Sequence, residues 1–144
     1  MTGAPGLGEG RPPSPLRFVW STFPDSRTAR ETSRRVVEGG FAACATELPA
    51  YSIYRWKGKV EQNPEVVVLF KTSPKKVGAL FEEIRRLHPY EVPELVETEA
   101  ARVDEPYLRW VLEGVDSDPA EAARAAGLPP SKSPRRGATR PAAP

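Results

Sequence analysis

The stretch that decides the fold reads VVVLFKTSPKKVGALFEEIRRL, from Val66 to Leu87. Its first part is an uninterrupted apolar run, which is typical of a central strand with both faces covered. After Ser73-Pro74 the apolar residues recur three and four positions apart, at Val77, Leu80, Phe81, Ile84 and Leu87. That spacing predicts an amphipathic helix that begins near Pro74. His88-Pro89 should end it, because a residue before proline is pushed out of the helical conformation.

Upstream, residues 17–23 (RFVWSTF) are rich in aromatic and β-branched side chains and predict a strand. Asp25 or Ser26 then caps a polar helix over residues 26–38, which Gly39-Gly40 ends. Residues 41–56 predict a long strand that is interrupted near Pro49. A tight turn at Lys57-Gly58-Lys59 joins it to the apolar strand as a hairpin.

Downstream, residues 92–100 predict a fourth strand and residues 104–115 a short last helix. The resulting order, β-α-β-β-α-β plus a helix, is the α+β arrangement called ferredoxin-like. Two helices cover only one face of a four-stranded sheet. The apolar run at 66–70 and the aromatic hairpin residues Tyr51, Tyr54 and Trp56 therefore predict an oligomer that hides the second face.

The ends of the chain differ from its middle in composition. All five Phe, three Trp and four Tyr lie between Phe18 and Trp110. Residues 1–16 are rich in Gly and Pro, and residues 117–144 are rich in Pro, Ala and Arg, so both are predicted to be disordered. The tail carries a net charge of +3 and residues 17–116 carry −1. A folded part without basic excess does not favour nucleic-acid binding.

The sequence also indicates a cellular compartment and the classes of function that are not expected. The longest apolar run is far shorter than the roughly 20 residues of a membrane span, and the first residues lack the pattern of a secretory signal. One cysteine cannot form an internal disulfide. These features predict a cytoplasmic protein. With a single His, no Gly-rich phosphate loop and no Gly-aromatic RNA-binding signature, an enzyme or an RNA-binding domain is not expected.

Short motifs stand in order along the predicted domain. They are 21–25 (STFPD), 41–46 (FAACAT), 52–59 (SIYRWKGK), 88–94 (HPYEVPE) and 107–111 (YLRWV). Together they resemble the CutA divalent-cation tolerance protein family over residues 17–115. The resemblance implies a compact homotrimer of ferredoxin-like subunits, packed through long hairpin strands. It also implies a link to copper and other divalent metals, without a firmly bound cofactor.

The chain departs from this family at three places. Members credited with copper binding carry a Cys where this chain has Ser21 and a second His where it has Leu87. Losing a soft sulfur ligand and an imidazole predicts weak copper binding. A third departure follows the fourth strand, where residues 102–104 replace the usual Gly-Asn/Asp turn.

His88, Cys44 and Glu91 are the candidate metal ligands. His88 is the only imidazole, and its alternative role is to cap the carbonyl end of the preceding helix. Cys44 is the only thiol, and its alternative role is to pack as a small apolar residue. Glu91 adds a carboxylate from the loop that follows His88. A firm site would need ligands from a second subunit.

Tyr54, Trp56, Lys71 and Tyr90 form a second candidate group. The aromatic residues either fill the hairpin and trimer contact or line a pocket between subunits, in which Lys71 and His88 attract an anion. Trimers of this shape resemble the PII-like signalling proteins, which hold small ligands in clefts between subunits. The alternative function is therefore a trimeric scaffold or signalling module that binds a small ligand or a partner protein.

Overall fold

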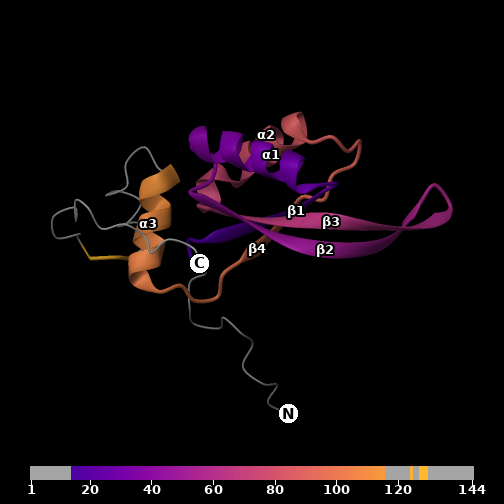
Figure 1. The fold of residues 1–144 in the computed structure, drawn as a ribbon. Helices are drawn as coiled ribbons and strands as arrows, with labels where there is room; N and C mark the ends of the chain where they lie inside the picture. Colours follow the sequence, from indigo (N-terminus) through magenta and orange to yellow (C-terminus); the bar gives the residue numbers. More distant parts are fainter. Residues whose placement is uncertain (1–13, 116–123, 125–126, 130–144) are drawn as a thin grey trace, which may run out of the picture.

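The computed structural model describes residues 14–115, 124 and 127–129. Its elements follow in the order β1 (Arg17–Phe23), α1 (Ser26–Glu38), β2 (Cys44–Trp56), β3 (Lys59–Thr72), the 3-10 helix η1 (Pro74–Lys76), α2 (Val77–Leu87), β4 (Val96–Glu99) and α3 (Glu105–Val115). This confirms the expected α+β fold with its β-α-β-β-α-β order and final helix (Figure 1).

The strands form one antiparallel sheet in the order β2-β3-β1-β4, which places the apolar strand β3 in the interior. Helices α1 and α2 lie together over one face (Figure 1). The core between helices and sheet contains fully buried side chains from both layers, among them Val19, Phe23, Val36, Val68, Phe70, Leu80 and Ile84. Burying one side chain of this size stabilises the fold by about 2 kcal/mol.

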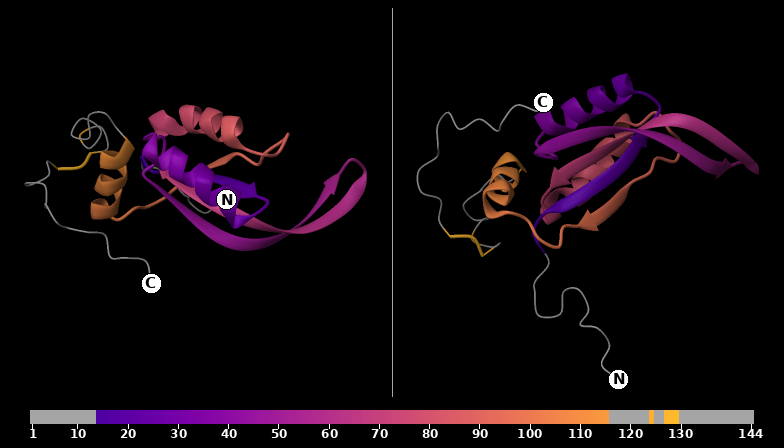
Figure 2. Two further views of the ribbon diagram at one scale, coloured as in Figure 1. Left: turned by 45° about the horizontal axis from the view of Figure 1, so that its top comes forward. Right: turned by 60° about the horizontal axis from the view of Figure 1, so that its bottom comes forward.

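A second, smaller core lies at the end of the sheet opposite the hairpin tip, under α3 (Figure 2). Its buried side chains are Leu16, Ala100, Leu108, Val111 and Leu112. Phe18, which points away from α1 and α2, packs against this cluster, and so does Leu128. Leu16 falls in the segment predicted to be disordered, yet it is 2% exposed.

The rest of the sheet face opposite α1 and α2 is apolar and open. Alternation along β1 and β3 puts Trp20, Val67 and Leu69 on this face, where they are half-buried. On the neighbouring strands, Leu48 is 49% exposed and Val96 is 47% exposed. No described part of the chain fully covers this surface.

The β2–β3 hairpin extends far beyond the helices (Figure 1). Two residues, Lys57 and Gly58, join its strands, and their φ angles are 49° and 79°. Two successive left-handed residues are the signature of the type I′ turn, whose twist matches that of the paired strands. The predicted tight turn is therefore present, and it sets the register that pairs Trp56 with Lys59.

The two edges of the sheet differ. β2 forms one edge with 13 residues, whereas β4 forms the other with only four exposed residues. Arg17 holds β4 by ion pairs, at 3.0 Å to Glu97 and 3.5 Å to Glu99. Edge strands that are short and charged resist pairing with other chains.

Two expected strands have different bounds. β2 begins at Cys44 and continues through Pro49, where an interruption was expected. Proline fits there because β2 is an edge strand, and edge strands tolerate a missing N–H. β4 covers Val96–Glu99 rather than 92–100, since Pro93 lacks a donor for a strand ladder.

Most of the terminal predictions fall on residues outside the described ranges. Residues 1–13 and nearly all of 117–144 are in this group, so disorder there stays a prediction. No helix in the described part of the chain is long and apolar enough to cross a membrane.

Candidate functional site

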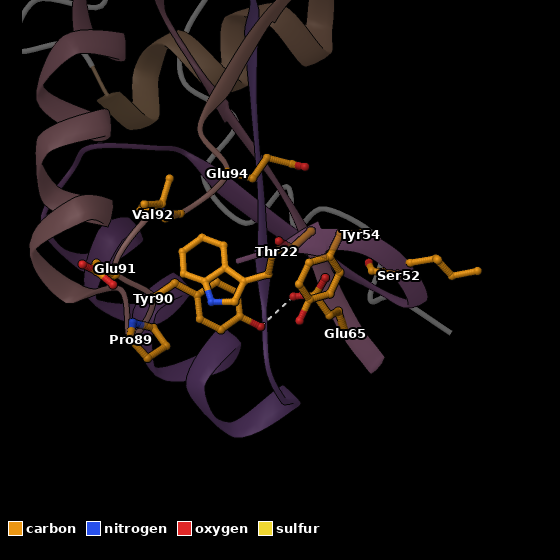
Figure 3. Close-up of a pocket in the computed structure, with 12 residues that line it drawn as sticks. Thr22, Ser52, Tyr54, Glu65, Pro89, Tyr90, Glu91, Val92 and Glu94 are labelled. Atoms are coloured by element: carbon orange, nitrogen blue, oxygen red, sulfur yellow. Dashed lines mark hydrogen bonds between the residues drawn. The ribbon is translucent and has the colours of Figure 1, made fainter. Parts of the chain in front are cut away.

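A cavity of about 740 Å³ opens at the base of the hairpin (Figure 3). Its walls come from the outer part of β2, from β3, from the end of β1 and from the loop between α2 and β4. Three aromatic side chains line it, Tyr54, Trp56 and Tyr90. Three carboxylates line it as well, Glu65, Glu91 and Glu94. The fold thus brings together hairpin and loop residues that lie 25 to 40 positions apart in the sequence.

His88 anchors the loop to the sheet. Its backbone N–H donates to the Ile84 carbonyl at 2.8 Å and closes α2. The ring atom Nδ1 accepts the Tyr90 backbone N–H at 3.0 Å. Nε2 therefore carries the ring proton and donates to the Thr22 carbonyl at 2.7 Å. The ring also stacks on Phe23, with centroids 4.4 Å apart.

These contacts favour the neutral form of His88. Burial lowers the pKa of His88 below its usual value of 6.5, against the smaller opposing effects of the Thr22 hydrogen bond and the Glu65 charge. A metal ion would need the lone pair on Nδ1, and that lone pair already accepts a hydrogen bond. Metal binding at His88 therefore competes with the anchoring of the loop.

Tyr90 connects the loop to β3. Its hydroxyl donates to Glu65 Oε2 at 2.6 Å, the contact drawn as a dashed line in Figure 3. Burial, together with the hydrogen bond and the charge of Glu65, raises the pKa of Tyr90 above its ordinary value of 10.0. The hydroxyl therefore stays protonated at neutral pH and keeps Glu65 fixed at one side of the cavity.

The hairpin contributes the other two rings. Tyr54 accepts a hydrogen bond from Asn63 Nδ2 at 2.8 Å across the two strands. Trp56 is 40% exposed, and the Lys57 ammonium lies 5.7 Å from its ring centroid. A tryptophan face attracts cations at such distances.

Lys71 lies outside this cavity. It is 8% exposed, on the sheet face opposite α1 and α2, and its ammonium donates to Thr46 Oγ1 and lies 3.6 Å from Cys44 Sγ. Within one chain, the structure therefore brings Tyr54, Trp56 and Tyr90 to one cavity and leaves Lys71 outside it, and the pocket between subunits stays a prediction.

The three candidate metal ligands are also separated. Cys44 on β2 pairs with Lys71 on β3, and Lys71 pairs in turn with Phe18 on β1, four residues along β1 from the Thr22 that His88 contacts. Four strand residues span about 13 Å. Glu91 lines the cavity, whereas His88 lies beneath the loop. In the described ranges, no three His, Cys, Asp or Glu side chains gather closely enough to hold a metal ion.

Sequence reasoning missed two carboxylates of the cavity, Glu65 and Glu94. Glu65 stands in a polar stretch before the apolar run, and nothing local distinguishes it from a solvent-facing residue. Its role depends on Tyr90, 25 positions later. Glu94 belongs to the HPYEVPE motif, which was the available signal.

Fold and site together define a ferredoxin-like α+β domain with a protruding two-stranded arm and an aromatic, acidic cavity at the arm's base. Residues 17–114 match the family model described as CutA1 divalent ion tolerance protein. The chain belongs to this family.

Individual relatives agree with that assignment. Protein CutA of Mus musculus is 40% identical over 114 residues, which are 78% of this chain and 64% of the mouse protein. This chain thus covers less than two thirds of that relative's length. The crystal structure of CutA from Xylella fastidiosa is 38% identical with a TM-score of 0.70, covering 72% of this chain and 100% of that one. A structure titled as the periplasmic divalent cation tolerance protein CutA from Archaeoglobus fulgidus is 28% identical with a TM-score of 0.69, over 70% of this chain and 99% of that one.

Proposed function

We propose that this protein acts in divalent-cation tolerance as a non-catalytic homotrimer in the cytoplasm. The observation that carries the proposal is the apolar surface of the hairpin. Tyr51 is 63% exposed, Ile53 is 66% exposed and Val60 is 58% exposed. Exposed apolar side chains gathered on one protruding element indicate a protein interface.

A second surface complements the first. The open sheet face carries Trp20, Leu48, Val67, Leu69 and Val96. A ring of three identical chains requires contact between two unlike surfaces of each chain. An arm that protrudes and a face that receives it meet this requirement.

Copper binding by this chain is proposed to be weak and centred on His88. The Lys71 ammonium beside Cys44 Sγ opposes the approach of a cation to the thiol. At His88 a copper ion must displace the Tyr90 N–H from Nδ1. Glu91, in the same loop, is the nearby carboxylate, and further ligands would come from a second subunit.

The proposed trimer is tested by native mass spectrometry. The wild type should appear at three chain masses, and Ile53→Asp should shift the population to single chains. Val37→Asp is the matched control, because Val37 is 37% exposed on α1 and is not part of the hairpin. A wild type that stays a single chain at micromolar concentration contradicts the proposal.

Copper is added in the same experiment. We expect uptake by the wild type that His88→Gln reduces and Cys44→Ser leaves unchanged. Undiminished copper uptake by His88→Gln would show that the copper site lies elsewhere.

A trimer that takes up no copper would support the alternative function, a scaffold or signalling module. The cavity at the hairpin base favours this alternative, because it is large enough for a small organic ligand. Cell fractionation tests the compartment.

A further inference from the structure

The cavity at the hairpin base carries charge of one sign. Glu65, Glu91 and Glu94 line it, and its described lining includes no Lys, Arg or His. His88, beneath the loop, is held in its neutral form. Neither cation that was expected to attract an anion in a pocket between subunits lines this cavity, since Lys71 lies elsewhere on the sheet. The cavity is therefore suited to a cation.

The aromatic lining also favours a positively charged ligand. The rings of Tyr54, Trp56 and Tyr90 line one cavity, and ring faces attract ammonium groups. The Lys57 ammonium already lies over the Trp56 ring, with Nζ 5.7 Å from the ring centroid. The same rings offer apolar surface to an alkyl chain.

The arrangement of the carboxylates distinguishes an organic cation from a metal ion. A divalent metal needs several oxygens within about 2.6 Å of one point. No such group of acidic side chains exists in the described ranges. Figure 3 shows Glu91 beside Pro89, Glu94 further along the loop and Glu65 on the far side of Tyr90. Oε2 of Glu65 is also engaged by the Tyr90 hydroxyl. Dispersed negative charges match positive charges that are themselves spaced apart.

We propose that this cavity binds an extended aliphatic amine with two or more ammonium groups. The ammonium groups pair with the dispersed carboxylates, and the methylene chain packs on the aromatic rings. A cavity of about 740 Å³ accommodates such a molecule. This inference goes beyond the proposed role in cation tolerance and does not depend on copper binding.

The test is calorimetric titration of the full chain with spermidine in 0.15 M salt, which screens long-range attraction. The double variant Glu91→Gln/Glu94→Gln should weaken binding about tenfold, at roughly threefold for each exposed carboxylate. Both side chains are exposed, so the variant should fold. Trp56→Leu should weaken binding roughly fivefold. Glu113→Gln, which removes an exposed carboxylate on α3, is the matched control and should bind like the wild type.

Three outcomes would overturn the proposal. The first is no heat of binding with spermidine. The second is equal weakening by Glu113→Gln, which would show attraction by overall charge. The third is displacement of spermidine by equimolar Mg²⁺, which would show a metal site. None of these results bears on the trimer or on copper, so failure here is separable from failure of the proposed function.

Discussion

At the scale of single residues, His88 has the most consequential contacts. Its ring bridges β1 and the loop through the Thr22 carbonyl and the Tyr90 N–H. Only the neutral ring can make both bonds, because protonation turns Nδ1 from acceptor into donor. The ring also fills space against Phe23. The same histidine that is a candidate metal ligand, as the chain's only imidazole, is thus a structural element of the loop.

The stability of the fold therefore depends on pH and decreases as the pH falls. The pKa of His88 is lowered in the folded state, whereas the unfolded chain titrates near 6.5. Below that value the unfolded state binds a proton that the folded state does not, so stability falls as pH decreases through 6.5 toward the folded-state pKa. We expect the free energy of unfolding, from urea denaturation at fixed protein concentration, to be lower at pH 5.5 than at pH 7.5.

The variant His88→Gln isolates this effect. It should cost about 2 kcal/mol at pH 7.5, from the lost ring stack and weakened hydrogen bonds. It should also lose less stability than the wild type between pH 7.5 and pH 5.5. Asp25 does not interfere, because its pKa is lowered from 3.8 by the Thr28 hydrogen bonds. Equal losses in both proteins would show that another group titrates.

Individual site residues were predictable to different degrees. Tyr54, Trp56 and Tyr90 were grouped because aromatic side chains dominate protein interfaces and stack on ligands. Lys71 was grouped with them as a cation for a pocket between subunits, and within one chain it lies outside the cavity, because its position along β3 relative to the hairpin depends on strand register. Register arises from pairing across the sheet and leaves no local trace in the sequence.

At the scale of elements, the hairpin turn decides how the arm is built. Gly58 has φ of 79° and Lys57 has φ of 49°. A side chain in this left-handed region costs about 1 kcal/mol. The turn therefore accepts one such residue at Lys57 and uses glycine for the other. The register of the whole arm, and with it the place of Trp56 in the cavity, follows from this two-residue connection.

Substituting the glycine tests this argument. Gly58→Ala should lower the free energy of unfolding by about 1 kcal/mol, from backbone conformation alone, since an added Cβ at Gly58 meets nothing within 4 Å. Gly78→Ala is the matched control in α2, where an added Cβ also meets nothing within 4 Å. It should stabilise by up to about 1 kcal/mol. Chemical denaturation measures both, and a loss at Gly78 equal to that at Gly58 would contradict the turn assignment.

Element boundaries followed from the sequence where local chemistry defines them. Asp25 caps α1 through the Thr28 N–H at 2.7 Å, and Pro89 follows the end of α2, both as expected. The sequence predicted a hairpin across Lys57-Gly58-Lys59 but did not indicate where the third strand begins, because residues 59–65 are polar and contain Pro64. Their strand conformation depends on pairing with residues 50–56.

At the scale of the whole molecule, the apolar surface is divided between an arm and a sheet face. Both are left open by the described part of the chain. If a trimer covers them, folding and association are linked, and the unfolding temperature must rise with protein concentration. We expect calorimetric midpoints to increase over a hundredfold concentration range. For Ile53→Asp the midpoint should be lower and independent of concentration, and a concentration-independent wild type would contradict a trimer.

The acidic β4 edge affects how copies of the chain can associate. Contacts between unlike surfaces can propagate into open-ended fibres when the ring fails to close. Strand addition at an exposed edge is the usual route for such growth. A four-residue edge carrying Glu97 and Glu99, with Arg17 bound alongside, offers a poor template to a further strand. The β4 edge thus protects the molecule from aggregation, while the apolar surface of the hairpin arm remains available for contact with another chain.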